Sequence, residues 1–379
     1  MLFWHLAAFL FLENFASRCL EIDPLFPAQL KTKFFSKIVH AGKVELEIIK
    51  KLNTMKKLFC VIALAVLAIS ASAQKIFMGE AAENQLLLAD PFILEDDGWY
   101  YIYGTHAADG IVVYRSKDLK TWSDRCGNAK NKLALHKDDV WGDRMYWAPE
   151  VYKVGNKFLM TYSCQEHICY AESDSPCGPF VQREHKPYLP QEKGIDSSIF
   201  IDDDGKAYMF WVRFTNGNAI WVAEMTNDLR QVKLETARHL LDAKDGTWEH
   251  QLGRVVEGPM VIKLGGKYYL TYSGNDFRSQ DYAVGYAVAE KPMGPYKRYE
   301  GNPILHRHRG YYGTGHHALL KKGNGYYMVY HAHNSASQVQ TRQTLIAPLT
   351  IKRDKTNGRF AEDYILGVSH KIIIPIVEK

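Results

Sequence analysis

The residues best suited to chemistry are three acidic side chains, Asp90, Asp196 and Glu257, each at the start of an apolar, strand-like run. Hydrolysis of a glycosidic bond needs two such groups, because one carboxylic acid protonates the leaving oxygen while a carboxylate activates water or attacks the anomeric carbon. A third carboxylate nearby raises the pKa of the acid by like-charge repulsion. Three carboxylates in equivalent positions therefore indicate a site for sugar hydrolysis.

A repeated β-hairpin is the element that must position these side chains. Each copy has a polar residue, an apolar strand, a turn with Gly and an aromatic strand, and the copies begin at Asp90, Pro149-Glu150, Asp196, Glu257 and His316. Successive copies start about 46 to 61 residues apart, a period typical of propellers. We therefore predict an all-β, single-domain, five-bladed β-propeller. The polar residues that begin the copies would converge at one end of its central channel.

Aromatic side chains make up 13% of the chain and are candidates for stacking on sugar faces at the channel rim. The candidates are Trp99, Tyr146, Trp147, Phe214 and Trp248. Packing between blades is the alternative for each of them. We name Trp147 and Phe214 as the substrate contacts.

Six ordered segments resemble glycoside hydrolase family 43. They are Ala89-Asp90-Pro91, Arg115 to Trp122, Trp147-Ala148-Pro149-Glu150, Ile195-Asp196-Ser197-Ser198, Val256-Glu257-Gly258-Pro259 and Gly315-His316, within a stretch from about Gln85 to Arg353. The resemblance implies a five-bladed propeller and hydrolysis with inversion. It makes Asp90 the general base and Glu257 the general acid, and it assigns to Asp196 the tuning of that acid's pKa and orientation.

The resemblance also implies roles for residues around the carboxylates. His316 would bind a structural ion or a water in the channel, with Ca²⁺ as the expected ion, and no cofactor is required for the chemistry. Arg342 would contact the substrate beside the carboxylates. Inversion predicts that the acid and base carboxyls lie about 6.5–9.5 Å apart, whereas about 5 Å would indicate a retaining enzyme.

The expected substrate is a plant cell-wall polysaccharide or oligosaccharide, from which an exo-acting enzyme removes α-L-arabinofuranose or β-D-xylose. An endo-arabinanase and a galactan-active enzyme are the alternatives within the family. A non-catalytic carbohydrate-binding propeller is the alternative from another class. Retaining propeller enzymes that act on fructans carry a Trp-Met-Asn-Asp-Pro type of signature, but here Leu87-Leu88-Ala89 precede Asp90.

The N-terminal region reads as a secretion signal behind an upstream extension. Met55-Lys56-Lys57 is followed by the apolar run Leu58 to Ile69 and by Ser70-Ala71-Ser72-Ala73. The run is about a dozen residues long, which is too short for a bilayer span of about 20 residues. We predict that residues 1–54 precede the true start, that 55–73 are a signal peptide, and that 74–379 form the exported enzyme, periplasmic or extracellular.

The composition and charge of the chain exclude several other classes of protein. Hydrophobic residues make up 46% and charged residues 23%, which excludes long disorder and a polytopic membrane protein. The formal net charge of +5 comes without a Lys/Arg cluster, so we expect no nucleic-acid partner. Beyond residue 73 the cysteines are Cys126, Cys164, Cys169 and Cys177, and their pairing is left open. For the His306/His308 and His331/His333 pairs, hydrogen bonding is favoured over metal binding.

Overall fold

The computed structural model describes residues 79–354 and 363–378, and the interpretations of residues 1–54 and 55–73 lie outside this part of the chain. The described residues form strands joined by turns and four short 3-10 helices. These are η1 (Lys130–Lys132), η2 (Lys137–Asp139), η3 (Leu234–Thr236) and η4 (His308–Gly310). Within the same residues, no helix is long and apolar enough to cross a membrane.

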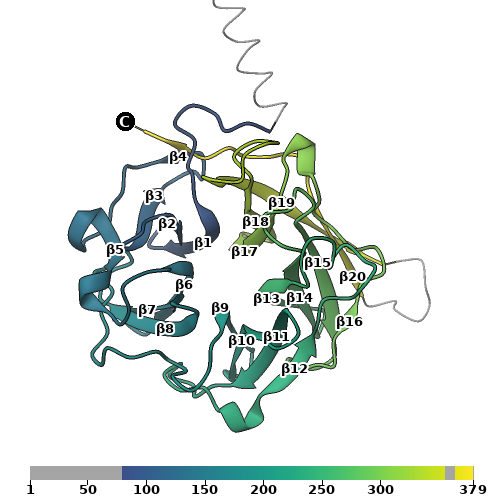
Figure 1. The fold of residues 1–379 in the computed structure, drawn as a ribbon, viewed down its shortest axis with the longest axis horizontal. Helices are drawn as coiled ribbons and strands as arrows, with labels where there is room; N and C mark the ends of the chain where they lie inside the picture. The colour runs from purple at the N-terminus through teal and green to yellow at the C-terminus, as the bar shows by residue number, and fades with distance from the viewer. Residues whose placement is uncertain (1–78, 355–362, 379) are drawn as a thin grey trace, which may run out of the picture. The chain divides into compact units, whose positions relative to one another are not determined.

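The strands form five sheets that follow one another around a central axis (Figure 1). We number these sheets as blades 1 to 5. Blade 1 contains β1 (Ala89–Asp96), β2 (Trp99–Thr105), β3 (Gly110–Ser116), β4 (Thr121–Trp122), β5 (Leu133–His136) and β21 (Ile376–Val377); blade 2 contains β6 (Trp147–Val154), β7 (Lys157–Cys164) and β8 (His167–Ser173).

The remaining three blades each have four antiparallel strands. Blade 3 contains β9 (Ile195–Ile201), β10 (Ala207–Phe214), β11 (Asn218–Glu224) and β12 (Arg238–Leu241); blade 4 contains β13 (Val256–Leu264), β14 (Lys267–Gly274), β15 (Ala283–Ala289) and β16 (Lys297–Arg298); blade 5 contains β17 (Gly315–Lys322), β18 (Gly325–Ala332), β19 (Gln343–Arg353) and β20 (Tyr364–Val368). The predicted five-bladed, all-β propeller is confirmed.

The predicted hairpins are the first two strands of each blade. In blade 1, Asp96 pairs with Trp99, and the intervening Asp97 and Gly98 have φ values of 47° and 67°. Two successive positive φ values are the requirement of a type I′ turn, which suits the twist of the strands. An Asp-Gly pair adopts this backbone at low cost, which explains why the sequence turns here.

The core lies between neighbouring blades and is rich in aromatic rings. The second strand of every blade carries at least one fully buried ring; among these rings are Tyr103, Tyr162, Trp211, Tyr272 and Tyr330. These rings account for part of the high aromatic content of the sequence. They also fix the second strand on which, as described below, several groups of the site are mounted.

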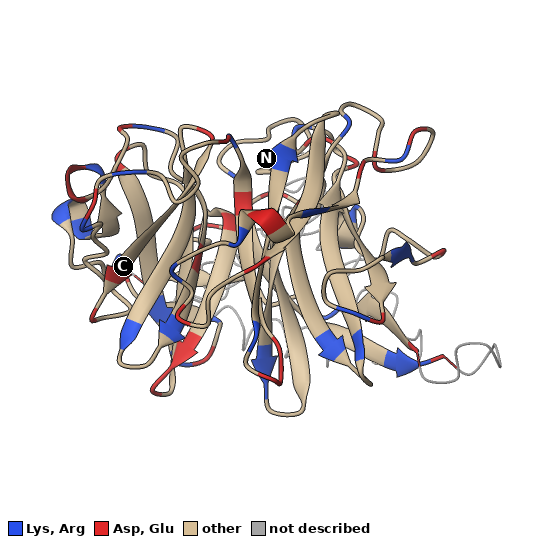
Figure 2. Cartoon of the chain, turned by 90° about the horizontal axis from the view of Figure 1, so that it is seen from below, with Lys and Arg blue, Asp and Glu red and all other residues tan. Residues whose placement is uncertain are grey.

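The ring of blades is closed by strands from both ends of the described chain. β21 pairs in parallel with β4, with Ile376 beside Thr121 and Val377 beside Trp122. The N–H of Val377 also donates to the carbonyl of Asn84 at 2.8 Å. Blade 1 is therefore completed by residues far away in the sequence. On the view in Figure 2, basic and acidic residues are interspersed over the strand ends and loops.

Candidate active site

Each innermost strand starts with a β-bulge whose central residue has a positive φ. The strand register shifts at this point in all five blades. The residues with positive φ are Asp90 (49°), Ala148 (45°), Asp196 (56°), Gly258 (53°) and His316 (40°). A bulge of this kind bends the strand and aims a side chain away from the regular pleat.

The acidic residues do not all occupy equivalent strand positions, which corrects the expectation from the sequence. Asp90, Asp196 and His316 occupy the same position in their blades, but Ala148 and Gly258 occupy it in blades 2 and 4. Glu257 stands one residue before the bulge, and Glu150 stands two residues after it. Glu257 thus presents its carboxyl from a different strand position than Asp90 and Asp196.

The backbone N–H of each bulge residue donates to a side chain of the preceding blade. In four blades the acceptor lies near the end of the second strand: His331 Nδ1 for Asp90 (3.1 Å), Thr105 Oγ1 for Ala148 (3.0 Å), Ser163 Oγ for Asp196 (3.1 Å) and Ser273 Oγ for His316 (2.8 Å). These acceptors were not predicted from the sequence, although Thr105, Ser163 and Ser273 are small polar residues at or next to the last position of their strands. Four acceptors thus lock four bulges.

Blade 3 has an exception that involves a predicted site residue. Its equivalent second-strand position is Val212, which pairs with Ile195 and has no acceptor atom. The N–H of Gly258 donates instead to Oδ2 of Asp196 at 3.1 Å. Asp196 therefore holds the backbone immediately after Glu257.

Asp90 is a buried carboxyl held in its charged form. Its Oδ2 accepts from Thr105 Oγ1 at 2.7 Å, and its Oδ1 accepts from Arg342 Nη1 at 3.0 Å. Burial raises the pKa of such a group, but Arg342, His316 and His331 outweigh burial, so the pKa of Asp90 lies well below its usual range. Asp90 is consequently ionised at neutral pH.

Glu257 and Asp196 have the opposite electrostatics. Burial and then the charge of Asp196 raise the pKa of Glu257 to about 7, although Tyr282 Oη and Asn218 Nδ2 each donate to its carboxylate at 2.8 Å. Burial and then the charge of Asp90 raise the pKa of Asp196 to about 7. One site thus contains an ionised carboxylate beside two interacting carboxyls that resist ionisation, the arrangement that separates a base from an acid.

His316 and Arg342 both contact the carboxylates. His316 Nδ1 lies 3.4 Å from Asp90 Oδ1 and 3.7 Å from Asp196 Oδ2. Arg342 immediately precedes β19, and its guanidinium carbon lies 4.8 Å from the ring centroid of Phe277. The structure therefore places Arg342 on Asp90, and its expected contact with substrate stays a prediction.

The aromatic candidates divide into two groups. Trp147 is partly exposed and immediately precedes the bulge at Ala148. Phe214 is 42% exposed and pairs with Asn218, whose side chain donates to Glu257. Both residues therefore stand at the end of the blades where the carboxylates lie.

The other three aromatic candidates differ in where they lie. Trp99 pairs with Asp96 at the far end of β1, and Lys117 Nζ lies 4.0 Å from its ring centroid. Tyr146 is buried in the core. Trp248 stacks on Tyr272, with ring centroids 5.8 Å apart. For Trp99 and Tyr146 the packing alternative holds, whereas a substrate contact of the partly exposed Trp248 stays a prediction.

A small cavity of about 10 Å³ lies among the innermost strands. Its lining includes Asp90, Glu150, Asp196, His316 and His317. Burial raises the pKa of Glu150 to about 8. A cavity of this size holds about one water.

The carboxylates and His316 can be compared with the ligand set that the expected Ca²⁺ requires. Donor atoms of Asp196, Glu257 and His316 lie within 4.8 Å of one another. Ca²⁺ takes 6–8 oxygen ligands, and a mixed set of two carboxyls and one imidazole falls short of that shell. The structural Ca²⁺ stays a prediction, and metal analysis of the purified protein tests it.

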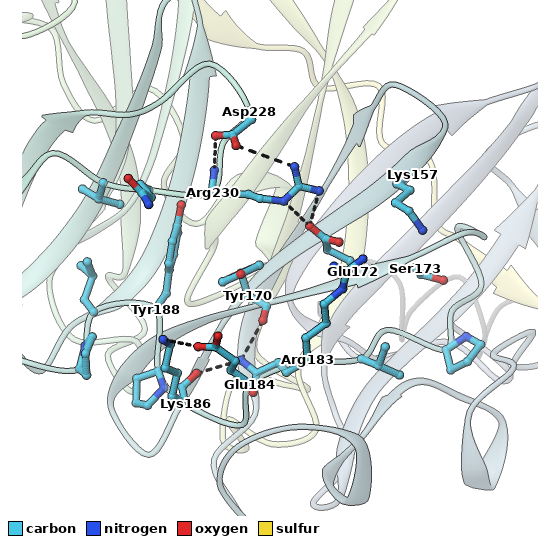
Figure 3. A pocket seen from close by; sticks show the side chains of 18 of the residues that line it. Lys157, Tyr170, Glu172, Ser173, Arg183, Glu184, Lys186, Tyr188, Asp228 and Arg230 are labelled. Carbon is cyan, nitrogen blue, oxygen red and sulfur yellow. Dashed lines mark hydrogen bonds and ion pairs between the residues drawn. The ribbon is translucent and has the colours of Figure 1, made fainter.

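A larger cavity of about 930 Å³ lies elsewhere, beside β8 (Figure 3). It includes Lys157 and Ser173, at the ends of β7 and β8 that are remote from the bulges, and the ion pair of Arg230 with Glu172 at 2.8 Å. None of the predicted site residues lines it. The candidate site is therefore identified by its carboxylates and not by cavity size.

The chain matches a known protein family and several solved structures. The family described as glycosyl hydrolases family 43 matches residues 84–357. A solved structure titled endo-1,4-beta-xylanase, from Bacteroides thetaiotaomicron, is 40% identical, has a TM-score of 0.70, and is matched over 78% of this chain and 99% of that chain.

Two further proteins extend the comparison. An endo-arabinase structure from the same organism is 28% identical, with a TM-score of 0.59, over 71% of this chain and 96% of that chain. A beta-xylosidase from Xylanibacter ruminicola is 26% identical in an alignment 293 positions long that covers 64% of this chain and 87% of that protein. The match to the family covers most of the chain, and the chain belongs to glycosyl hydrolases family 43.

Proposed function

We propose that the protein is an exo-acting, inverting glycoside hydrolase that removes α-L-arabinofuranose or β-D-xylose from plant cell-wall polysaccharides or oligosaccharides. The observation that carries this proposal is the opposite displacement of two pKa values at one site. The pKa of Asp90 is held well below its usual range, while that of Glu257 is raised to about 7. Such a pair supplies a base and an acid at the same pH.

In the proposed reaction, Asp90 takes a proton from a water that attacks the anomeric carbon. Thr105 and Arg342 fix its two oxygens and keep it ionised. Glu257 gives its proton to the leaving oxygen, which becomes a hydroxyl of the released chain. Asp196 holds the N–H of Gly258 and raises the pKa of Glu257 by its charge. A single displacement of this kind inverts the anomeric configuration.

Exo action is supported by the depth of the carboxylates. Asp90, Asp196 and Glu257 are 8%, 7% and 8% exposed. A recessed site admits a chain end or a branch sugar more easily than the middle of a polysaccharide. Endo action is the second candidate, because two similar solved structures are titled endo-1,4-beta-xylanase and endo-arabinase.

A product assay on arabinoxylan, arabinan and xylo-oligosaccharides tests the proposal. We expect free arabinose or xylose, with the inverted anomer appearing first by NMR. We expect Asp90→Asn and Glu257→Gln to lower kcat by about 10²–10⁴-fold, since each removes one proton-transfer group. Oligosaccharide products would favour the endo candidate, and a retained anomer would contradict the single displacement. Binding without turnover by the wild-type protein would favour a carbohydrate-binding propeller.

We also propose that the enzyme is exported to the periplasm or the cell exterior after cleavage near residue 73. The support is the pattern of two lysines, an apolar run and small residues between Met55 and Ala73. N-terminal sequencing of protein from its native host tests this, and a mature protein that begins near Met1 would contradict it.

A further inference from the structure

Two partly exposed thiols face each other across the boundary between blades 1 and 2. Cys126 Sγ and Cys177 Sγ lie 3.0 Å apart, although the residues are 51 positions apart in the sequence. Cys126 follows β4 and Cys177 follows β8. We propose that these two cysteines form a disulfide between the blades by exchange with a small, anionic disulfide.

The other two cysteines of the described chain have a different environment. Cys164 and Cys169 are buried. The Sγ of Cys164 lies 3.3 Å from the carbonyl oxygen of Arg144, and that of Cys169 lies 3.7 Å from the carbonyl oxygen of His167. Each thus contacts backbone rather than a second thiol, and each serves as an internal comparison for the exposed pair.

Backbone hydrogen bonds already hold the two segments together without the sulfur atoms. The N–H of Asn128 donates to the carbonyl of Cys177 at 2.9 Å, and its side-chain Nδ2 donates to the carbonyl of Gly178 at 2.8 Å. The N–H of Cys126 donates to Val113 at 3.0 Å. A disulfide has its sulfurs about 2.05 Å apart, so bond formation needs an approach of only about 1 Å.

The two thiols differ in acidity, which assigns their order of reaction. The hydrogen bond with Cys126 and then the charge of Arg115 lower the pKa of Cys177 despite its partial burial. The same hydrogen bond and burial raise the pKa of Cys126. Because the thiolate is the nucleophile in disulfide exchange, Cys177 attacks first.

The exchange balances as two successive displacements. Cys177 thiolate attacks one sulfur of the donor disulfide, forms a mixed disulfide and releases one donor thiolate. Cys126 then loses its proton to solvent and attacks Cys177 Sγ, which releases the second donor thiolate. The two cysteines lose two electrons in total, and the donor disulfide gains them as two thiols.

A cavity of about 540 Å³ gives a donor access to the pair. Both cysteines line it, together with Arg115, Arg125, Lys132 and Asp124. Three cations against one carboxylate favour an anionic donor, and oxidised glutathione is a suitable probe because it carries carboxylates on a small disulfide.

The test is peptide mapping of the folded protein after incubation with oxidised glutathione. We expect a Cys126–Cys177 crosslinked peptide, 2 Da lighter than the two separate peptides. The crosslink closes a loop that spans two blades, and we expect it to raise the unfolding temperature by about 5 °C relative to protein treated with dithiothreitol. No crosslink, or a crosslink through Cys164 or Cys169 instead, would overturn the proposal.

Single variants test whether both thiols are needed, and the wild-type protein tests the order of attack. In Cys126→Ala, Cys177 should keep a stable mixed disulfide with glutathione, and the temperature difference should vanish. In Cys177→Ala, Cys126 should likewise keep a single mixed disulfide, because the second displacement needs a partner thiol. Cys169→Ala leaves the pair intact and should crosslink as the wild-type protein does. In wild-type protein quenched early, peptide mapping should find the first mixed disulfide on Cys177; glutathione on Cys126 instead would contradict the assigned order.

Discussion

At the scale of single residues, the acid Glu257 is surrounded by groups with opposing effects on its pKa. Burial and Asp196 favour the neutral carboxyl, whereas Tyr282 and Asn218 donate to the charged form. The ring of Tyr282 is stacked on His331, with centroids 5.6 Å apart and planes 8° from parallel. The phenol is therefore positioned by a residue that also contacts Asp90.

Removal of the Tyr282 hydroxyl should move the alkaline limb of the pH–rate profile upward. Glu257 must be protonated to act, so activity falls above its pKa, and loss of a donor to the carboxylate raises that pKa. A hydrogen bond to a charged group is worth about 1.5–3 kcal/mol, so Tyr282→Phe should shift the limb of kcat/KM by about one pH unit. Tyr272→Phe is the matched control, because its phenol donates to Glu249. A shift toward acid in Tyr282→Phe would refute this account.

The sequence showed the three carboxylates but not their partners, for a physical reason. Asp90, Asp196 and Glu257 begin hairpins and so repeat with the blades. Asn218 begins the third strand of blade 3 and Tyr282 immediately precedes that of blade 4, so both lie outside the repeated hairpin, and no local pattern connects them with Glu257. Their role depends on tertiary contacts alone.

At the scale of elements, the site depends on five bulges that are locked by the neighbouring blade. The hairpins were predictable because their turns carry Gly and their strands carry buried aromatic rings. The bulges were not predictable. Only the bulge of blade 4 has a glycine at the position with positive φ, and the other four have Asp90, Ala148, Asp196 and His316 there. The backbone strain of these residues is offset by the acceptors described above.

Gly258→Ala should reduce both stability and activity. Gly258 has a φ of 53°, and a Cβ placed there would lie 3.4 Å from the ring of His316, an ordinary contact. The cost in unfolding free energy is therefore that of the left-handed backbone, about 1–2 kcal/mol. We expect kcat to fall as well, because the N–H of Gly258 aligns Asp196.

Gly155→Ala is the matched control for this variant. Gly155 has a φ of 60° in an open turn, with no atom within 4 Å of an added Cβ. Chemical denaturation should show a similar loss of stability in both variants, whereas only Gly258→Ala should lose kcat. Equal kcat in the two variants would show that the bulge does not orient the site.

At the scale of the whole molecule, the number of blades was predictable but their closure was not. The five hairpins repeat in the sequence, and each became one sheet. β21 has only two residues, Ile376 and Val377, and so carries no periodicity by which a strand is predicted. Its pairing with β4 is a long-range contact that only the folded ring defines.

Because strand pairing near the two ends of the described chain closes the ring, the same propeller should form when the chain begins in a different blade. The N–H of Val377 bonds to Asn84, and Gln85 forms a bridge with Ile376, so residues near 84 and 378 are spatial neighbours. A circular permutant that joins them by a short Gly/Ser linker and opens between Gly155 and Asn156 should keep kcat/KM within about threefold and unfold in one transition. Separate unfolding of blade 2 by calorimetry would show instead that continuity of that hairpin, and not the closed circle, holds the propeller together.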